Sequence, residues 1–298
     1  MVGLETYLGE ALALSSAVIW AFAVILFKKS GEVVHPIGLN FFKGALAIIL
    51  IIPTTWLFGE TLLRDVPASE YWLLLASGAL GIGVADTLFF KSLNVLGAGR
   101  SAIIDCMYSP SIISLSIIFL GESLTVLQII GTTLIVSAVL SIIVEKHETI
   151  TDRRHLLFGV TWGVLAMITM AVGIVMIKPL LNNSPLLWAT EVRLVGGLII
   201  LMIVWMVHPA RRAIAASIIA PQRWVYTVSG SFLGAYLSMI VWLGGMKYTQ
   251  ASTAAALSQT SNIFIFIFAA LFLKEKITSI RMVAIGLGVI GAVFVIFG

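Results

Sequence analysis

The sequence predicts an all-α membrane protein, with ten transmembrane helices arranged as two inverted five-helix repeats. The first observation is composition: 60% of the 298 residues are apolar, 11% are charged, and the mean hydropathy is +1.09. Soluble domains are about 45 to 50% apolar and about 25% charged. The other two observations are the length of the apolar stretches and an internal repeat. Helices are expected because period-two alternation is absent and lipid cannot satisfy backbone amides.

Ten apolar stretches follow one another, each long enough to span a bilayer core of roughly 20 helical residues. They cover residues 11–28, 37–58, 71–91, 100–120, 124–144, 156–178, 186–207, 224–246, 251–273 and 278–297. The first ten residues contain no Lys or Arg, so the first stretch is expected to be retained rather than cleaved as a signal peptide. The longest polar link, residues 145–155, lies at the middle and separates a first repeat, 1–148, from a second, 149–298.

The two halves share a motif. Residues 119–125 read FLGESLT and residues 272–278 read FLKEKIT, 153 positions later, so that Glu122 coincides with Glu275. Because each repeat would hold an odd number of helices, the second copy would enter the membrane from the opposite side. Inverted repeats of this kind build many secondary transporters around one midplane site.

A second shared feature is a basic residue early in the second helix of each half, Lys43 and Arg193, which are 150 positions apart. With the FL-x-E-x-(L/I)-T motif, these halves resemble the EamA branch of the drug/metabolite transporter superfamily over residues 11–297. Lys43 departs from the resemblance, since the family pattern usually shows Arg there. The resemblance implies export or exchange of small metabolites, among them amino acids, through a central cavity lined by helices from both halves.

Several other classes of function are excluded or disfavoured. The net charge of +4 comes from basic residues scattered singly, so nucleic acid is not a partner. Cys106 is the single cysteine, which excludes an intrachain disulfide and a thiolate metal site. No HExxH, Walker or GxSxG motif is present, and we expect no enzyme activity, no metal and no cofactor. The expected partners are a small-molecule substrate and the lipid bilayer of the cell membrane, with a monomer favoured over a homodimer.

The loop charges are unevenly divided between the two expected faces. One face carries Lys28, Lys29, Lys91, Arg100, Lys146, Arg153, Arg154, Arg211, Arg212, Arg223, Lys274 and Lys276, and the other carries Arg64, Lys178 and Lys247. The positive-inside rule places the first face in the cytoplasm and both termini outside. The resembling family is often drawn with its termini inside, so the two sources disagree.

Five ionisable residues fall inside the apolar stretches, where each costs at least about 2.5 to 3.5 kcal/mol unless it faces protein or water. They are Lys43, Asp86, Asp105, Glu191 and Arg193. Asp86 and Asp105 lie toward the same end of antiparallel stretches, where they could bracket a cavity mouth and carry a proton. The alternative is a static ion pair with Lys43. Glu191 and Arg193 point in different directions; Lys43 and Arg193 either anchor each half or receive a substrate carboxylate.

A polar site is expected near the middle of the fourth and ninth stretches. Pro110 should kink the fourth stretch and free a carbonyl group. Tyr108 and Pro110 fall opposite the repeat segment that contains Ser258, Gln259 and Asn262. We interpret these residues as substrate-binding, with ordinary interhelical hydrogen bonding as the alternative.

Two aromatic residues, Trp20 and Tyr236, lie within the first and eighth stretches and could form the cavity wall, although core packing is as common a use. Glu122 and Glu275 stand at helix ends, where structural capping is favoured.

The resulting hypothesis is a secondary-active carrier that works by alternating access, with its cavity between the first, third, fourth, sixth, eighth and ninth stretches. Its substrate would be a small metabolite, such as an amino acid or an amphipathic solute for export, and proton coupling is one option. An uncoupled facilitator or exchanger, and a non-transporting scaffold or lipid-carrier subunit, stay open.

Overall fold

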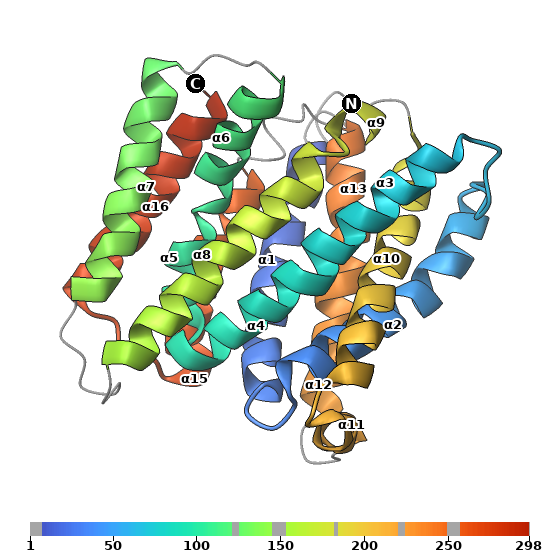
Figure 1. Cartoon of the computed structure of the whole chain (residues 1–298). Coiled ribbons are helices and arrows are strands. Elements are labelled where there is room, and N and C mark those ends of the chain that lie inside the picture. The colour runs from blue at the N-terminus through green and yellow to red at the C-terminus, as the bar shows by residue number, and fades with distance from the viewer. Residues whose placement is uncertain are drawn as a thin grey trace.

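A computed structural model describes residues 8–120, 125–144, 153–181, 184–219, 224–248 and 257–297, and within these ranges the fold is entirely helical. The helices of the first half are α1 (Leu8–Ser30), α2 (Pro36–Leu57), α3 (Ala68–Gly78), the π-helix η1 (Ala79–Val84), α4 (Ala85–Leu96), α5 (Ala98–Asp105), α6 (Tyr108–Leu120) and α7 (Val126–Val144). α1 begins and α16 ends on the same side of the molecule (Figure 1).

The second half begins at α8. Its helices are α8 (Arg153–Val175), α9 (Lys178–Leu181), α10 (Leu186–Val207), α11 (Arg211–Ile219), α12 (Trp224–Ser231), the π-helix η3 (Phe232–Leu237), α13 (Ser238–Tyr248), α15 (Ser261–Leu273) and α16 (Ser279–Phe297). The short helix α11 was not predicted; its buried Ile214 packs with Ile37 of α2 and Leu201 of α10.

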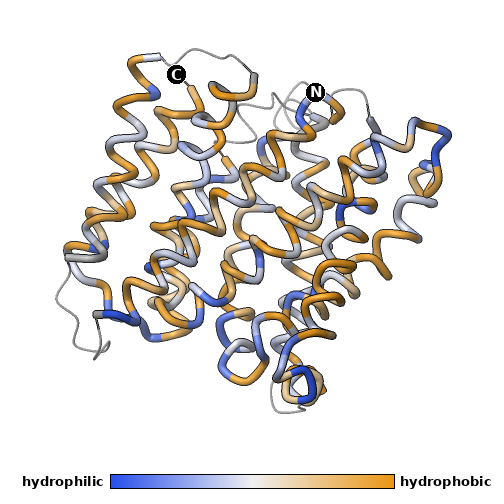
Figure 2. Tube along the Cα trace, viewed as in Figure 1, coloured by the Kyte–Doolittle hydropathy of each residue, from blue (hydrophilic) through white to orange (hydrophobic). Residues whose placement is uncertain are grey.

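Seven helical runs of the described residues are long and apolar enough to cross a membrane. They correspond to the first, second, third, sixth, seventh, eighth and tenth predicted stretches. The fourth stretch is divided between α5 and α6, and the fifth and ninth contain shorter apolar helices, Val126–Ser141 and Leu257–Leu273. Apolar residues cover most of the outer trace, while hydrophilic residues gather toward the helix ends (Figure 2).

The fourth stretch breaks at Cys106 and Met107, between α5 and α6. The cause is Pro110, because a proline ring clashes with the carbonyl group four residues earlier, here that of Cys106. Pro110 itself lies in the first turn of α6, where its missing N–H is not needed. The predicted kink is therefore present, one turn before the proline.

The third and eighth stretches each contain a short π-helix, and the two π-helices lie at equivalent positions of the repeats. η1 starts at Ala79 and η3 at Phe232, 153 residues later, and the two end at Val84 and Leu237 with the same separation. π-helices are rare and occur frequently at functional sites. The two halves thus share an unusual backbone feature. Its two copies are separated by 153 residues, as are the two copies of the FL-x-E-x-(L/I)-T motif.

Helix packing is also matched between the halves. α1 packs on α13 and α15, and its counterpart α8 packs on α4 and α6; α2 packs on α12, and α10 on α3. Two further contacts join counterparts directly, α7 with α16 and α2 with α10, and α5 also packs on α15. Figure 1 shows α7 beside α16 at one edge of the molecule and α8 beside α4.

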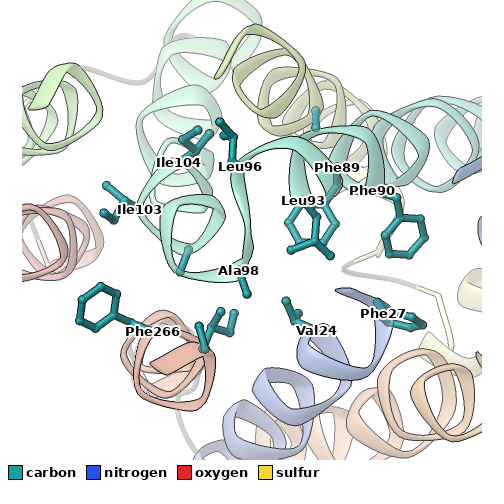
Figure 3. Packing of buried hydrophobic residues seen from close by; sticks show 14 of the residues in the cluster. Val24, Phe27, Phe89, Phe90, Leu93, Leu96, Ala98, Ile103, Ile104 and Phe266 are labelled. Atoms are coloured by element: carbon teal, nitrogen blue, oxygen red, sulfur yellow. The ribbon is translucent and has the colours of Figure 1, made fainter. Parts of the chain in front are cut away.

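The largest buried apolar cluster joins both halves at one end of the molecule. We call this the basic end, because it carries Lys28, Lys91 and Arg154. Phe27 of α1, Phe90 of α4 and Phe266 of α15 belong to the cluster (Figure 3).

Gly78 allows α3 to approach α10 at backbone distance. A Cβ atom at this position would overlap the carbonyl group of Arg193. We therefore expect Gly78→Ala to destabilise the fold by about 1 to 3 kcal/mol, as overpacking does. The midpoint of thermal unfolding in detergent measures this. Gly286→Ala is the control, since nothing lies within 4 Å of its added Cβ; an equal loss in both variants would contradict the close-packing explanation.

Candidate functional site

A cavity of about 400 Å³ lies between helices of both halves, within the size range of small-molecule sites. Its lining residues are Ser16, Ala17, Trp20, Asp86, Phe89, Asp105, Tyr108, Met167, Met170, Ser238, Met239, Trp242, Ser258, Gln259 and Ser261. They come from the first, third, fourth, sixth, eighth and ninth predicted stretches. The wall is largely apolar, with two carboxylates and several hydroxyl groups.

Most of these lining residues form pairs between the two repeats. The pairs 153 residues apart are Asp86 with Met239, Phe89 with Trp242, Asp105 with Ser258, and Tyr108 with Ser261; Ala17 with Met167 and Trp20 with Met170 are 150 apart. Twelve of the fifteen lining residues belong to such pairs, so each half supplies nearly the same surface. The side chains within a pair differ, which makes the cavity symmetric in position and asymmetric in chemistry.

Asp86 is the second residue of α4, just past the π-helix η1, and forms a buried ion pair with Lys43 of α2. Their side chains are 12% and 7% exposed. The Lys43 ammonium group also lies 5.5 Å from the centre of the Phe90 ring. The sequence left two interpretations of Asp86 open, a proton carrier at a cavity mouth and an ion pair with Lys43. The structure contains the ion pair, and the same Asp86 carboxylate also lines the cavity.

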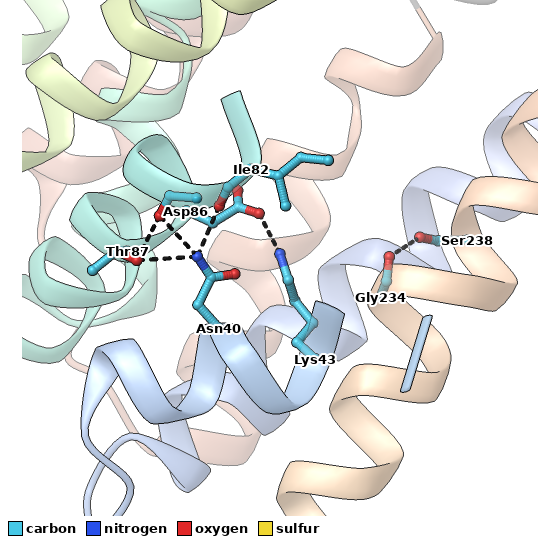
Figure 4. A network of polar contacts seen from close by, with 8 residues as sticks. Asn40, Lys43, Ile82, Asp86, Thr87, Gly234 and Ser238 are labelled. Carbon is cyan, nitrogen blue, oxygen red and sulfur yellow. Dashed lines mark hydrogen bonds and ion pairs between the residues drawn. The ribbon is translucent and has the colours of Figure 1, made fainter. Parts of the chain in front are cut away.

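The amide of Asn40 supports this ion pair from the same face of α2. Its Nδ2 atom donates to the carbonyl oxygens of Ile82 and Gly83, at 2.8 and 3.1 Å, and lies 3.0 Å from the Thr87 hydroxyl (Figure 4). Backbone carbonyl groups in a buried π-helix need such partners. Asn40 therefore fixes η1 and, with it, the position of Asp86.

Asp105, the last residue of α5, has an amide partner instead of a cation. The side-chain amide of Asn262 is its polar neighbour. Asn262 also donates to Gln259 Oε1 at 3.1 Å and to Cys106 Sγ at 3.5 Å, and Gln259 donates to the Ser109 hydroxyl at 3.1 Å. The repeat relates the contact between Asn262 and Cys106 to the contact between Gln259 and Ser109. Cys106 lies 153 residues before Gln259, and Ser109 lies 153 residues before Asn262.

Arg193 lies behind the cavity wall. Its guanidinium group is next to Gly81 of η1, where an added Cβ would lie 3.3 Å from Nη2. Its electrostatic neighbours are Tyr108 and Asp86, both on the cavity wall. Its buried Nε has no hydrogen-bond partner among the described residues. Glu191 is buried on another face of α10, also with an oxygen, Oε2, that no described residue pairs.

The predicted site residues divide into two groups. Trp20, Tyr108, Ser258 and Gln259 line the cavity, as do both aspartates. Three others are not among the lining residues. Pro110 is in the first turn of α6, and Asn262 is fully buried behind Gln259. Tyr236 lies in η3 and bonds Thr54 Oγ1 of α2 at 2.8 Å.

Several lining residues were not predicted. Three of them are the methionines Met167, Met170 and Met239, and others include Phe89 and Ser261. A signal for them existed, because each is the repeat counterpart of a residue on the opposite wall. Adding the offset of 150 residues to Trp20, for example, leads to Met170.

Below the cavity, Glu275 connects the two halves at the basic end. Its Oε1 accepts from the Ala98 amide at 2.7 Å and its Oε2 from the Gly99 amide at 3.1 Å, at the start of α5. Gly97 has φ of +84°, and a Cβ there would lie 2.6 Å from Oε1, so this cradle requires glycine. Lys28, an electrostatic neighbour of Glu275, donates to the Asn94 carbonyl at 2.8 Å. Glu275 is a cap, as predicted, but of a helix in the other half; Glu122 lies outside the described residues.

Comparisons with known proteins agree with this architecture. Residues 7–144 and 157–297 each match the family described as "EamA-like transporter family". A protein of Archaeoglobus fulgidus, named only as an uncharacterized transporter, is 26% identical over 280 residues, which are 92% of each chain. A crystal structure described only as that of a protein has a TM-score of 0.61 and 16% identity, over 94% of this chain and 96% of its own. The last likeness concerns the fold alone.

Proposed function

This chain belongs to the EamA-like transporter family, and we propose that it is a secondary-active carrier that moves a small metabolite by alternating access. It is a multi-pass integral protein of the cell membrane, and its family indicates a transporter rather than an enzyme. The observation that carries the proposal is the cavity, whose wall is assembled from paired positions of both halves.

The proposed architecture is ten transmembrane helices in two inverted five-helix repeats. It is supported by the matched π-helices, the matched packing of α1 with α13 and α8 with α4, and the exchanged contacts around Asn262. In such a fold, one end closes over the cavity while the other opens, because equivalent surfaces meet at each end. The buried cluster and the Glu275 cap at the basic end support a state closed there.

We further propose that Asp105, rather than Asp86, carries the coupling proton. Lys43 holds Asp86 as an anion, since removing its charge would leave a buried ammonium group unpaired. Asp105 lines the cavity next to the Asn262 amide, which can accommodate either protonation state of the carboxyl group. A group that binds and releases a proton during transport needs this freedom.

Asp105→Asn is expected to abolish the dependence of transport on a pH gradient while leaving exchange intact. A thermal-shift panel of metabolites first selects a solute that stabilises the purified protein. Uptake of that solute in radiolabelled form into proteoliposomes, with and without an imposed pH gradient, then measures coupling. Wild-type protein that ignores the gradient would indicate a facilitator or exchanger, and no flux of any stabilising solute would indicate a non-transporting subunit. Gradient-driven uptake by Asp105→Asn would contradict the role of Asp105.

Asn262→Leu is expected to weaken binding of the same solute by about tenfold, or about 1.4 kcal/mol, because Gln259 and Asp105 lose their shared partner. The solute concentration at half-maximal thermal stabilisation measures the change. The control is Ser114→Ala, an exposed hydroxyl on α6 that bonds only its own helix among the described residues. Wild-type affinity in Asn262→Leu would place the binding site elsewhere.

A further inference from the structure

We propose that the cavity takes organic anions: a carboxylate on an apolar body, bound by Lys43 and Arg193 in the place that Asp86 occupies in this structure. This inference rests on the proposed function, because it names the substrate class of the same cavity. It starts from the local charge. Lys43 and Arg193 supply two positive charges, and among the described residues Asp86 is the acid that neighbours both.

The cluster is therefore short of one negative charge in a buried setting. Lys43 is 7% exposed, and Arg193 has a buried Nε without a partner among the described residues. An uncompensated buried charge is costly, so an added anion would be stabilised here. Arg also presents a planar fork that matches a carboxylate, in contrast to the point charge of Lys.

A solute can reach this cluster through the position of Asp86. Asp86 and Tyr108 line the cavity, whereas the lining does not include Lys43 or Arg193, which lie behind them. A solute carboxylate would thus compete with Asp86 for the two cations and meet the Tyr108 hydroxyl. Asp86 acts as an internal stand-in for the ligand, and it compensates one of the two positive charges while the cavity is empty.

The remaining wall favours an apolar body on the anion. It contains the aromatic rings of Trp20, Phe89 and Trp242. It also contains three methionines, whose flexible and polarizable side chains adapt to varied shapes. Flat or branched apolar groups would pack against such a surface.

Three probes that share the same apolar phenylpropyl body and differ in charge test the proposal. They are the anion 3-phenylpropanoate, the neutral 3-phenylpropanamide and the cation 3-phenylpropylammonium. Binding to the purified full-length protein is followed by thermal stabilisation and by quenching of tryptophan fluorescence. The wild type should bind the propanoate at least about tenfold more tightly than the amide. Arg193→Gln should remove this preference, and Arg193→Lys should restore part of it.

Asp86→Asn is the most discriminating variant, because a purely structural Asp86 and an Asp86 that occupies the ligand position predict opposite effects on propanoate binding. Without ligand the variant should unfold at lower temperature, since Lys43 loses its partner. The propanoate should recover that loss and bind at least about tenfold more tightly than to the wild type. Asp105→Asn, which removes a lining carboxylate whose polar neighbour is the Asn262 amide, should show no lost stability for the anion to recover.

Equal binding of acid and amide, preference for the ammonium probe, or unchanged propanoate affinity in Asp86→Asn would overturn the proposal. None of these measurements requires transport. If anions bind as expected but no solute crosses liposomes, the carrier function fails and the anion site stands. If a neutral or cationic solute is transported and anions do not bind, the anion site fails and the carrier function stands.

Discussion

Lys43→Met is expected to destabilise the protein by about 3 to 5 kcal/mol, the usual cost of removing one partner from a buried ion pair. Methionine keeps most of the side-chain volume, so the loss reports the charge. Asp86 would remain buried, and Arg193 would be its remaining cationic neighbour among the described residues. The unfolding midpoint and the yield of monodisperse protein measure the effect.

The double variant Lys43→Met with Asp86→Asn tests the physical reason. Removing both charges should recover at least half of the loss, because a neutral pair carries no uncompensated charge. Lys29 offers a matched control, since its contact with Glu32 is 3.8 Å long between side chains that are 32% and 39% exposed, and Lys29→Met should cost under about 1 kcal/mol. Additive losses in the double variant would show that Lys43 and Asp86 are not energetically coupled.

Glu275→Ala is expected to open the basic end. The carboxylate joins the two halves by two charge-assisted hydrogen bonds to the first amides of α5, where the helix dipole also favours an anion. Loss of about 1 to 2 kcal/mol should raise the population of open states by about tenfold. Transport should fall as well, because a carrier needs both ends to close in turn.

Cysteine labelling measures this opening. In a Cys106→Ser background, Ala102→Cys places a thiol in α5 where the native side chain is 1% exposed. A membrane-impermeant maleimide should label it at least about ten times faster when Glu275 is replaced by Ala. Glu70→Ala, which removes a partly exposed acid from the first turn of α3, is the control and should leave the rate unchanged. Equal labelling in all three proteins would show that Glu275 caps a helix without closing the end.

Hydropathy located the seven long apolar helical runs of the described residues because burial in lipid acts on each stretch independently of its neighbours. The offset of 153 residues, read from two short motifs, also placed η1 on η3 and paired most of the cavity wall. The charged residues inside the membrane stretches could be identified from the sequence, since the energetic cost of inserting a charge makes such residues rare. The sequence left open whether Asp86 was paired or free, because that depends on how α2 and α4 approach each other.

The π-helices explain part of what pattern reasoning missed. An i to i+5 hydrogen-bond pattern changes the rotation of the helix, so the direction of a side chain such as Tyr236 cannot be read from a regular helical period. Asn262 and Gln259 are three residues apart, yet Gln259 lines the cavity and Asn262 is buried beside Cys106. Their depth was predictable, but which one faces the cavity was not.

The sequence by itself determined the helical membrane class, the doubling of the chain and the identity of the charged residues, because these follow from composition and local order along one chain. Only the tertiary structure decided that Lys43 neutralises Asp86, that Asp105 lies beside the Asn262 amide, and that Glu275 holds the opposite half. These contacts join residues far apart in sequence. Their geometry is set by how whole helices pack, and no local pattern contains that information.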